Sequence, residues 1–190
     1  MLKIKYFFFI IIFIFFSGIS NSIADTKSKI INNLSSIETL EFEFNQIAFG
    51  KEENGKCFLR RPHFLKCEYF NSKSQKELII NKKRLVINHK RYGKTYHFPV
   101  SKSYFVDILN KEKFKDLVEK ANLELNKNLY EIKYLAEAKG EIMFFFNKKS
   151  FDLIGWEILD VSGNHTRFEI KDLNKNQIIE KKLFYIGEVN

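Results

Sequence analysis

The sequence predicts a mainly β (α+β) fold, in which one strongly curved antiparallel sheet forms an incomplete β-barrel with a helical lid. Short segments of period-two alternation follow one another at regular spacing, with turn residues between them. In the first of these, Leu40, Phe42 and Phe44 alternate with polar side chains, which gives one apolar and one solvent-exposed face. Only two stretches have helical periodicity, too few to cover both faces of a sheet. We therefore expect the helices to plug one mouth of the barrel.

The N-terminus has the order of a secretory signal peptide. Residues 1–5 carry two lysines and no acid, residues 6–16 are an unbroken apolar run, and Ser22 and Ala24 supply small side chains before a cut. The run is about half the roughly 20 residues that a membrane-spanning helix needs. We expect cleavage after Ala24 and export to the periplasm, rather than an uncleaved anchor. No cysteine follows the cut, so no lipid is expected on the new N-terminus.

The remaining residues, 25–190, are expected to form a single domain, because no Gly-, Ser- or Pro-rich linker divides them. The formal net charge of +9 falls by two when Lys3 and Lys5 are removed with the leader. A basic balance favours acidic lipid head groups or nucleic acid. Export and the lack of an arginine-rich cluster exclude nucleic acid as the expected partner. The charge then serves mainly solubility, and a monomer is expected.

The helical and strand segments follow from periodicity and turn signals. Asp25 and Thr26 are suitable N-cap residues for a first helix that ends near Ser36, with Ile30 and Leu34 on its apolar stripe. A second helix is predicted over 101–121, and Phe105, Ile108 and Leu109 lie on one of its stripes and Phe114, Leu117 and Val118 on another. After the first strand, further strands are predicted over 55–61, 65–70, 76–80, 84–89, 95–98, 130–136, 141–146, 153–160, 166–171 and 178–185.

Catalysis has little support in the sequence. There is no Gly-x-Ser-x-Gly elbow, no phosphate-binding Gly-rich loop and no His-Glu-x-x-His, so we expect a non-enzymatic protein without cofactor or metal. Of the four histidines, His89 and His97 alone are placed to face one another across a hairpin, and the simpler interpretation is surface histidines. Glu41 and Glu43 share a strand face, where solvation is favoured over a paired acid and base. A secreted hydrolase stays as a third function class.

An ordinary hydrophobic core does not explain the position of one arginine, Arg61. Alternation puts Cys57, Leu59 and Arg61 on one strand face, and Leu65 and its alternate neighbours follow in the next strand. If these apolar sets line the concave side, Arg61 lies at its rim, where a buried cation needs partners. Backbone carbonyls of a helical plug would supply them. The alternative is a loop-end arginine that reaches solvent.

Cys57 and Cys67 are the only cysteines, and they lie at equal distances on either side of Pro62. Both fall on the same predicted face, and export puts them in an oxidising space. The spacing is compatible with a cross-strand disulfide. The alternative is two buried thiols that pack as small apolar groups.

The same alternation selects the side chains that would line a cavity on the concave side. A cavity that shelters acyl chains keeps each methylene from water, at about 0.8 kcal/mol apiece. For each residue singly, an ordinary filled core is the competing interpretation. The candidate lining residues are Phe42, Phe44, Leu59, Leu65, Tyr69, Ile80, Leu85 and Ile87.

Several short motifs, taken together and in order over residues 30–173, resemble the LolA family of periplasmic outer-membrane lipoprotein carriers. The resemblance implies an incomplete β-barrel with a helical lid over an apolar cavity. It implies a carrier that takes acylated lipoproteins from an inner-membrane ATP-driven releasing complex to an outer-membrane lipoprotein receptor. It also implies that Arg61 bonds the lid and acts in ligand release, with Arg60 as the second choice. The motifs are Phe44-Asn45-Gln46, Gly55, Arg61-Pro62, Tyr69, Ile108-Leu109, Trp156, Asp160, Gly163 and Thr166.

The chain departs from the family pattern at several places, and its C-terminal end lacks the family's proline. Cys67 stands where the family has tryptophan, Asn81-Lys82 replaces an Asp-Gly turn, and Ser103 replaces a proline. These changes bear on cavity shape and ligand more than on fold. A related periplasmic module that senses lipid or lipoprotein and regulates a partner is the second function hypothesis. Such sensors usually carry a second domain, for which we expect no room in this chain.

Overall fold

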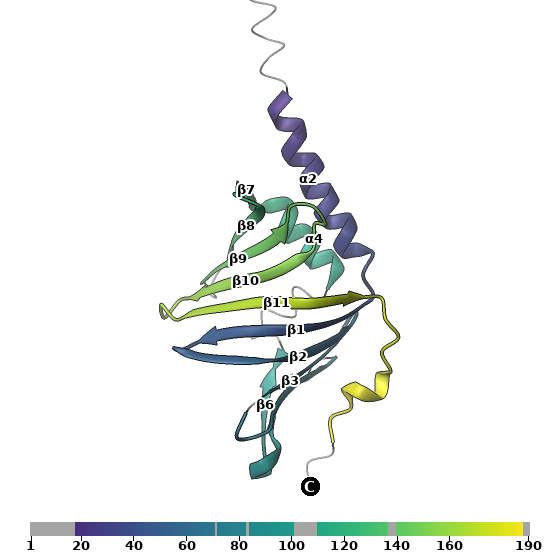
Figure 1. The fold of residues 1–190 in the computed structure, drawn as a ribbon, viewed down its shortest axis with the longest axis vertical. Coiled ribbons are helices and arrows are strands. Elements are labelled where there is room, and N and C mark those ends of the chain that lie inside the picture. Colours follow the sequence, from purple (N-terminus) through teal and green to yellow (C-terminus); the bar gives the residue numbers. More distant parts are fainter. Residues whose placement is uncertain (1–17, 71, 83, 101–109, 137–139, 188–190) are drawn as a thin grey trace, which may run out of the picture.

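Eleven antiparallel strands form one curved sheet in the order β6-β5-β4-β3-β2-β1-β11-β10-β9-β8-β7 (Figure 1). The computed structural model describes residues 18–70, 72–82, 84–100, 110–136 and 140–187. The predicted fold class is confirmed. The strands are β1 (Thr39–Ala48), β2 (Lys51–Arg60), β3 (Phe64–Tyr69), β4 (Lys76–Asn81), β5 (Arg84–His89), β6 (Lys94–Pro99), β7 (Asn122–Asn126), β8 (Leu129–Ala136), β9 (Gly140–Asn147), β10 (Leu153–Asp160) and β11 (His165–Lys175).

Two meanders are joined at the centre of this sheet by the pairing of β1 with β11, in which Phe44 lies opposite Ile170. One meander runs from β1 to β6 and the other from β7 to β11. The edges of the sheet are β6 and β7, so the barrel is open. All ten predicted strands from the first to 166–171 correspond to observed strands, and β7 is an additional strand that the sequence did not predict.

Strict alternation gives the sheet one apolar, concave face. Phe42 and Phe44 are 3% and 2% exposed, whereas Glu43 between them is exposed. Phe44 lies opposite Gly55 in β2, where an added Cβ would come within 2.8 Å of the Phe44 ring. Glycine at this position therefore lets a large aromatic ring lie flat against the neighbouring strand.

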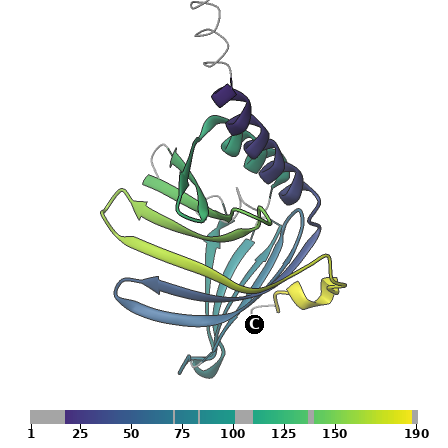
Figure 2. The same cartoon turned by 45° about the horizontal axis from the view of Figure 1, so that its top comes forward.

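Two helices, α2 (Gly18–Ser35) and α4 (Lys111–Lys120), lie side by side over one end of the curved sheet (Figure 2). Their apolar stripes face the concave side and bury Ile30, Leu34, Phe114, Leu117 and Val118. Within the described ranges, no helix combines the length and the apolar composition of a membrane span.

The predicted start of the first helix is wrong. The helix begins at Gly18, and Asp25 lies within it, where its carboxylate forms an ion pair with Lys29 one turn later. Residues 18–24 are already helical, so the backbone continues through Asp25 without a break and no cap is needed there. Of the second predicted helix, Lys111–Lys120 is observed, and 101–109 lies outside the described residues.

The predicted strand over 178–185 is also wrong. This segment crosses the outer face of the sheet and contains a short 3-10 helix, η3 (Lys181–Phe184). Both edges of β11 are already paired, to β1 and to β10, so the chain beyond Lys175 has no neighbouring edge to join. Ile179 and Phe184 pack instead on Phe64, and Ile186 packs on the outer side of β4 and β5.

The packing of this C-terminal segment predicts a large difference between two adjacent aromatic residues. Phe184 is fully buried against Phe64, whereas Tyr185 is 66% exposed. Phe184→Ala should lower the free energy of unfolding by about 3–5 kcal/mol through the cavity it leaves. Tyr185→Ala should change it by less than about 0.5 kcal/mol. Urea denaturation of both variants measures this, and equal effects would mean that the segment does not belong to the core.

Candidate functional site

The concave face is the candidate site, and all eight predicted lining residues lie on it. Six of them are buried in one cluster with side chains of α2 and α4, and Tyr69 and Ile87 are half-buried at its border. The six buried residues are Phe42, Phe44, Leu59, Leu65, Ile80 and Leu85.

Aromatic rings form the centre of this face. Trp156 stacks on Phe168 with ring centroids 4.1 Å apart and planes 8° apart, and Phe168 stacks on Phe44 at 4.8 Å. The three rings come from β10, β11 and β1, so they cross the junction of the two meanders. Flat aromatic surfaces of this kind present a large apolar area with little rotamer freedom.

Burial decreases across the concave face from β1 toward the β6 edge. Leu78 and Ile87 are half-buried, and Tyr96 and Phe98 on β6 are 46% and 44% exposed. Register places Tyr96 opposite Ile87 and Phe98 opposite Leu85, so all of them point to the concave side. The β5–β6 part of the site therefore offers apolar surface that the described residues cover incompletely.

Arg61 lies on this face, beneath the end of α2. Its side chain is 8% exposed, and its Nη1 donates a hydrogen bond of 3.0 Å to the carbonyl of Leu34 in the last turn of the helix. The same carbonyl accepts from the backbone N–H of Ile37 at 3.3 Å, and it lies at the negative end of the helix dipole, so a cation suits the position. Burial lowers the pKa of the Arg61 guanidinium and Glu38 raises it, and an arginine stays charged under these conditions.

The two helices are joined at both ends by lysines. Lys111 at the start of α4 donates to the carbonyl of Ser35 at the end of α2 and to the carboxylate of Glu38, which lowers the pKa of Glu38. Lys27 of α2 donates to the carbonyls of Glu119 and Ala121 at the end of α4. Each helix thus supplies a cation to the negative end of its antiparallel partner.

A second set of contacts fixes α2 to the sheet. Asn33 donates to the carboxylate of Asp152 and to the carbonyl of Phe151, in the loop between β9 and β10. Lys175 of β11 forms an ion pair with the same carboxylate. Burial alone would raise the pKa of Asp152, but hydrogen bonds from Lys175, Asn33 and Ser150 outweigh it and lower the pKa.

Arg60, the second choice for the role of Arg61, points to the opposite face. Its guanidinium donates to the carbonyl of Ile179 in the C-terminal segment, 3.0 Å away. The peptide bond between Arg61 and Pro62 is cis. Alternation therefore gives the two adjacent arginines different neighbours, the end of α2 for Arg61 and the C-terminal segment for Arg60.

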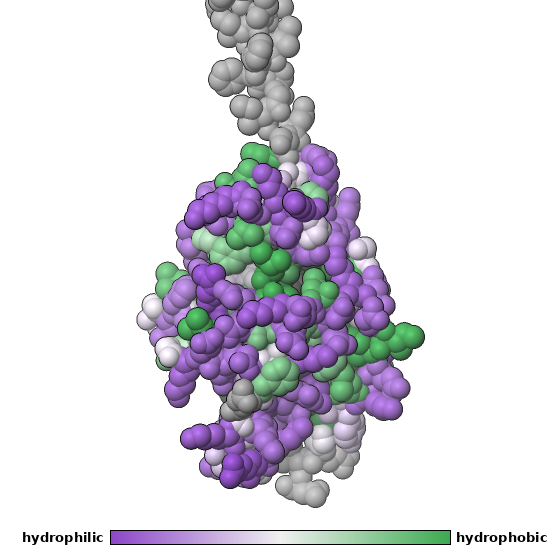
Figure 3. Space-filling model, in the orientation of Figure 1, coloured by the Kyte–Doolittle hydropathy of each residue, from purple (hydrophilic) through white to green (hydrophobic). Residues whose placement is uncertain are grey.

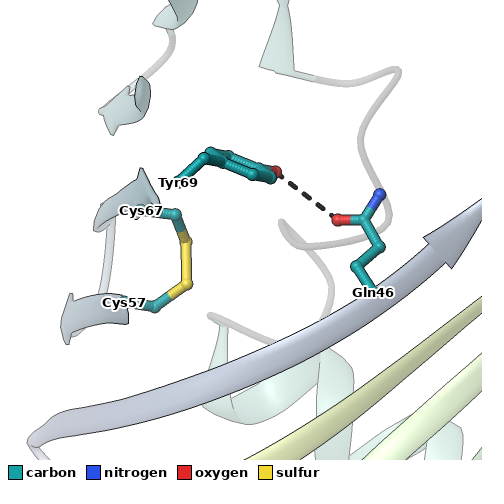
Figure 4. The surroundings of a disulfide bond; sticks show 4 residues. All are labelled: Gln46, Cys57, Cys67 and Tyr69. Carbon is teal, nitrogen blue, oxygen red and sulfur yellow. Dashed lines mark hydrogen bonds between the residues drawn. A yellow bond between two sulfur atoms is a disulfide. The ribbon is translucent and has the colours of Figure 1, made fainter. Parts of the chain in front are cut away.

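Cys57 and Cys67 form a disulfide between β2 and β3 on the concave side (Figure 4). Next to it, the Tyr69 hydroxyl donates to the Gln46 side chain at 3.4 Å, as the dashed line in Figure 4 marks. The ammonium of Lys76 lies 3.7 Å from the centre of the Tyr69 ring. Burial raises the pKa of Tyr69, and the nearby Glu53 adds to that effect.

The remaining sequence candidates lie apart from this site or do not meet. His89 faces the concave side with Ile87, whereas His97 lies opposite Val86 on the outer face, so the two do not face one another. Glu41 lies on the outer face, in an ion pair with Lys56. In the described part of the chain, no three His, Cys, Asp or Glu side chains gather as a metal site would require.

The structure also holds a groove of about 760 Å³ on the outer face of β8–β11, where Phe145, Glu157 and Arg167 are among the lining residues. Charged side chains border it, and Arg167 forms ion pairs with Glu157 and Glu169. Met143 and Phe145 give the groove an apolar part, but an acyl chain there would lie beside these charges and cost them solvation. The concave face, with its aromatic centre, is the better candidate.

Sequence reasoning missed the residues that hold the helices in place. Lys27, Asn33, Lys111 and Asp152 lie on polar faces or in loops, and their partners are distant in sequence. Periodicity carries no signal for such contacts. One available signal was the presence of lysines near the ends of both helices, where carbonyl ends of a neighbouring helix attract them.

An open curved sheet with an apolar, helix-covered concave face defines a class of proteins built to enclose a hydrophobic partner. Residues 35–187 match the family model described as outer membrane lipoprotein carrier protein LolA, and the chain belongs to this family. No curated protein sequence matches the chain.

Solved structures share the fold at low sequence identity. An uncharacterized conserved protein from Thermus thermophilus is 10% identical with a TM-score of 0.56, over 88% of this chain and 95% of that chain. A putative outer membrane lipoprotein-sorting protein domain from Vibrio parahaemolyticus is 8% identical with a TM-score of 0.50, over 86% and 94%. The Pseudomonas aeruginosa MucA/MucB complex contains a chain that is 10% identical with a TM-score of 0.51, over 87% and 61%. At these identities the likeness concerns the fold alone.

The disulfide predicts a measurable share of stability. It closes a loop over a sequence separation of 10, and removing a bridge of this kind costs about 2–4 kcal/mol, since the unfolded chain gains freedom. The double variant Cys57→Ala/Cys67→Ala should lose that amount in urea denaturation. A reductant should have a similar effect on the wild type and none on the variant. Identical unfolding curves for reduced and oxidised wild type would contradict the expectation.

The Asp152 contacts predict an acid-sensitive attachment of α2. A pKa lowered in the folded state contributes stability above the pKa of the unfolded chain, and this stability is lost as pH falls through the folded value. Asp152→Asn should therefore cost about 1–2 kcal/mol at pH 7, and the difference from wild type should shrink below about pH 4. Urea denaturation of both proteins from about pH 7 to about pH 2.5 measures it. A difference that stays constant over this range would refute the assignment.

Proposed function

We propose that this chain is a periplasmic carrier that binds the acyl chains of lipoproteins on the concave face, beneath α2 and α4. In this proposal the leader is cut after Ala24, and residues 25–190 act as one domain without cofactor or catalysis. The carrier takes acylated lipoproteins from an inner-membrane ATP-driven releasing complex and delivers them to an outer-membrane lipoprotein receptor. The observation that carries the proposal is the burial of Arg61 on an apolar face, bonded to the end of a covering helix.

The energetics of sheltering favour a cover that opens at modest cost. Each methylene removed from water contributes about 0.8 kcal/mol, so part of one acyl chain outweighs the loss of a few polar contacts. The bond from Arg61 to Leu34 involves a charged donor and contributes about 1.5–3 kcal/mol. Closure worth only a few kcal/mol keeps the empty face covered and still yields to a lipid.

The uneven burial of the concave face suggests where an acyl chain enters. Ile87, Tyr96 and Phe98 form a continuous apolar path from the β6 edge toward the buried cluster. Arg61 lies beyond this path, directly after β2, where α2 ends. An entering chain would displace the helices without first breaking the sheet, because the strands keep their own hydrogen bonds.

In this proposal the partner proteins, a donor and a receptor, determine the direction of transport. The sequence carries no nucleotide-binding motif, so the carrier does not drive its own cycle. A donor that binds the open form and a receptor with higher affinity for the cargo would move lipoprotein one way.

The second candidate is a periplasmic module that senses lipid or lipoprotein and regulates a partner. The structural likeness to MucB, which was solved in complex with MucA, favours this interpretation, and the chain spans 61% of that protein. Both candidates bind lipid on the concave face. They differ in hand-off, because a carrier transfers its cargo to a receptor and a sensor keeps it while it releases or engages a protein partner.

Native mass spectrometry of the protein isolated from the periplasm tests the proposal. Recovery of a complex with an acylated protein is the expected result, and lipid extraction identifies the acyl chains. Recovery with free lipid and a bound regulatory protein would favour the sensor. Recovery of neither, with labelling by serine or cysteine activity probes, would favour a hydrolase and reject the carrier.

The role of Arg61 gives a specific mutational prediction. Arg61→Leu should leave the chain folded, because leucine suits the apolar surroundings, but lipoprotein should accumulate on the carrier and transfer to the receptor should fall by tenfold or more. Arg60→Leu is the matched control, since it removes a neighbouring arginine that bonds the outer segment at Ile179. A release assay with circular dichroism as the folding check measures both. Normal transfer by Arg61→Leu would refute the role.

A further inference from the structure

Four strand connections lie along one margin of the sheet, away from α2 and α4 in both views (Figures 1 and 2). They are the β1–β2 hairpin, the β10–β11 hairpin, the β3–β4 connection and the loop with the short 3-10 helix η1 (Lys90–Tyr92) between β5 and β6. We call this edge the hairpin margin. Large apolar or aromatic side chains stand exposed on it: Phe49 (74%), Val161 (73%), Tyr92 (58%) and Phe70 (44%).

Phe49 is the most informative of these residues because its backbone is unfavourable for it. Ala48 pairs with Lys51, so Phe49 and Gly50 alone form the turn, with φ angles of 52° and 69°. A two-residue turn with both φ values positive is normally filled by Asn-Gly or Gly-Gly. A bulky aromatic residue in the left-handed region is uncommon, and asparagine would adopt it more readily. Stability does not explain this phenylalanine, whereas a function at the surface does.

The charge of the hairpin margin is mainly basic. Lys51, Lys73, Arg91 and Lys94 are exposed on it, and Arg91 is tied to the β3–β4 connection through the carbonyl of Ser74. Two of the nearby acids accept hydrogen bonds within the fold. The Asp160 carboxylate accepts from the backbone of Ser162 and from Asn164, and the Glu52 carboxylate accepts from Asn45.

The shape of the margin distinguishes between possible partners. Its apolar side chains stand on the tips of turns and project outward, and Figure 3 shows hydrophobic side chains on this margin among hydrophilic ones. Projecting apolar tips flanked by lysine and arginine suit the interface of an anionic bilayer, where rings enter the acyl boundary and cations bind phosphate. A protein partner would instead need a complementary set of pockets.

We propose that the hairpin margin docks the protein on anionic membrane surfaces, with Phe49 and Val161 inserted and Lys51, Lys73, Arg91 and Lys94 on lipid phosphates. This interaction is independent of ligand binding on the concave face. In the docked orientation α2 and α4 point away from the lipid, so the cover can move while the protein stays on the membrane.

Co-sedimentation with vesicles tests the docking, using protein recovered from the periplasm whose N-terminus has been determined, since an apolar leader would bind vesicles by itself. Wild type should bind vesicles of phosphatidylglycerol and phosphatidylethanolamine more tightly than vesicles of phosphatidylcholine, and salt should weaken the binding. Phe49→Asn should weaken it about fivefold or more, while the midpoint of thermal unfolding stays equal or rises. Charge removal in Lys73→Gln/Arg91→Gln/Lys94→Gln should weaken it about fivefold per side chain.

Ile178→Asn is the matched control, because Ile178 is 98% exposed but lies on the C-terminal segment, away from the hairpin margin. It should bind vesicles as wild type does. Equal binding to neutral and anionic vesicles, or an equal loss in Ile178→Asn, would overturn the proposal. A photo-crosslinker at position 49 that labels an envelope protein instead of lipid would overturn it in favour of a protein partner.

Discussion

A guanidinium buried on an apolar surface is costly unless it has acceptors, and this constraint connects the parts of the molecule. Arg61 donates to the carbonyl of Leu34 in the last turn of α2, at the negative end of the helix dipole. The contact is made only while α2 covers the concave face. Removing the helix exposes an apolar surface and leaves a cation beside it, so the cover and the sheet are coupled through this residue.

The concave face, the outer face and the hairpin margin of the single sheet differ in what covers them. The concave face is apolar and covered by the helices, and the outer face of β2–β5 is covered by the C-terminal segment through Phe184 and Ile186. Exposed apolar tips remain at the hairpin margin, far from the helix ends that Lys27 and Lys111 join. Cargo binding and membrane docking would therefore use different parts of the fold.

Alternation predicted the sheet and its concave face, because each strand is half-buried and period two is a strong signal. It also placed Arg61 on the concave side and Arg60 opposite. It could not predict β7, whose residues are mostly exposed, nor exclude a strand over 178–185, since that depends on which sheet edges are free. The lysine contacts between helices and the turn geometry of Phe49 depend on distant neighbours and on φ angles, which composition does not encode.

An acyl chain bound on the concave face would lie close to the single tryptophan of the sequence, whose fluorescence reports on it directly. Trp156 is 4% exposed and stacks on Phe168 at the centre of that face. A lipopeptide with brominated acyl chains should quench its fluorescence on binding, and the same lipopeptide without bromine should not. Binding of the brominated lipopeptide with no quenching of Trp156 would show that the cargo lies elsewhere and would contradict acyl-chain binding on the concave face.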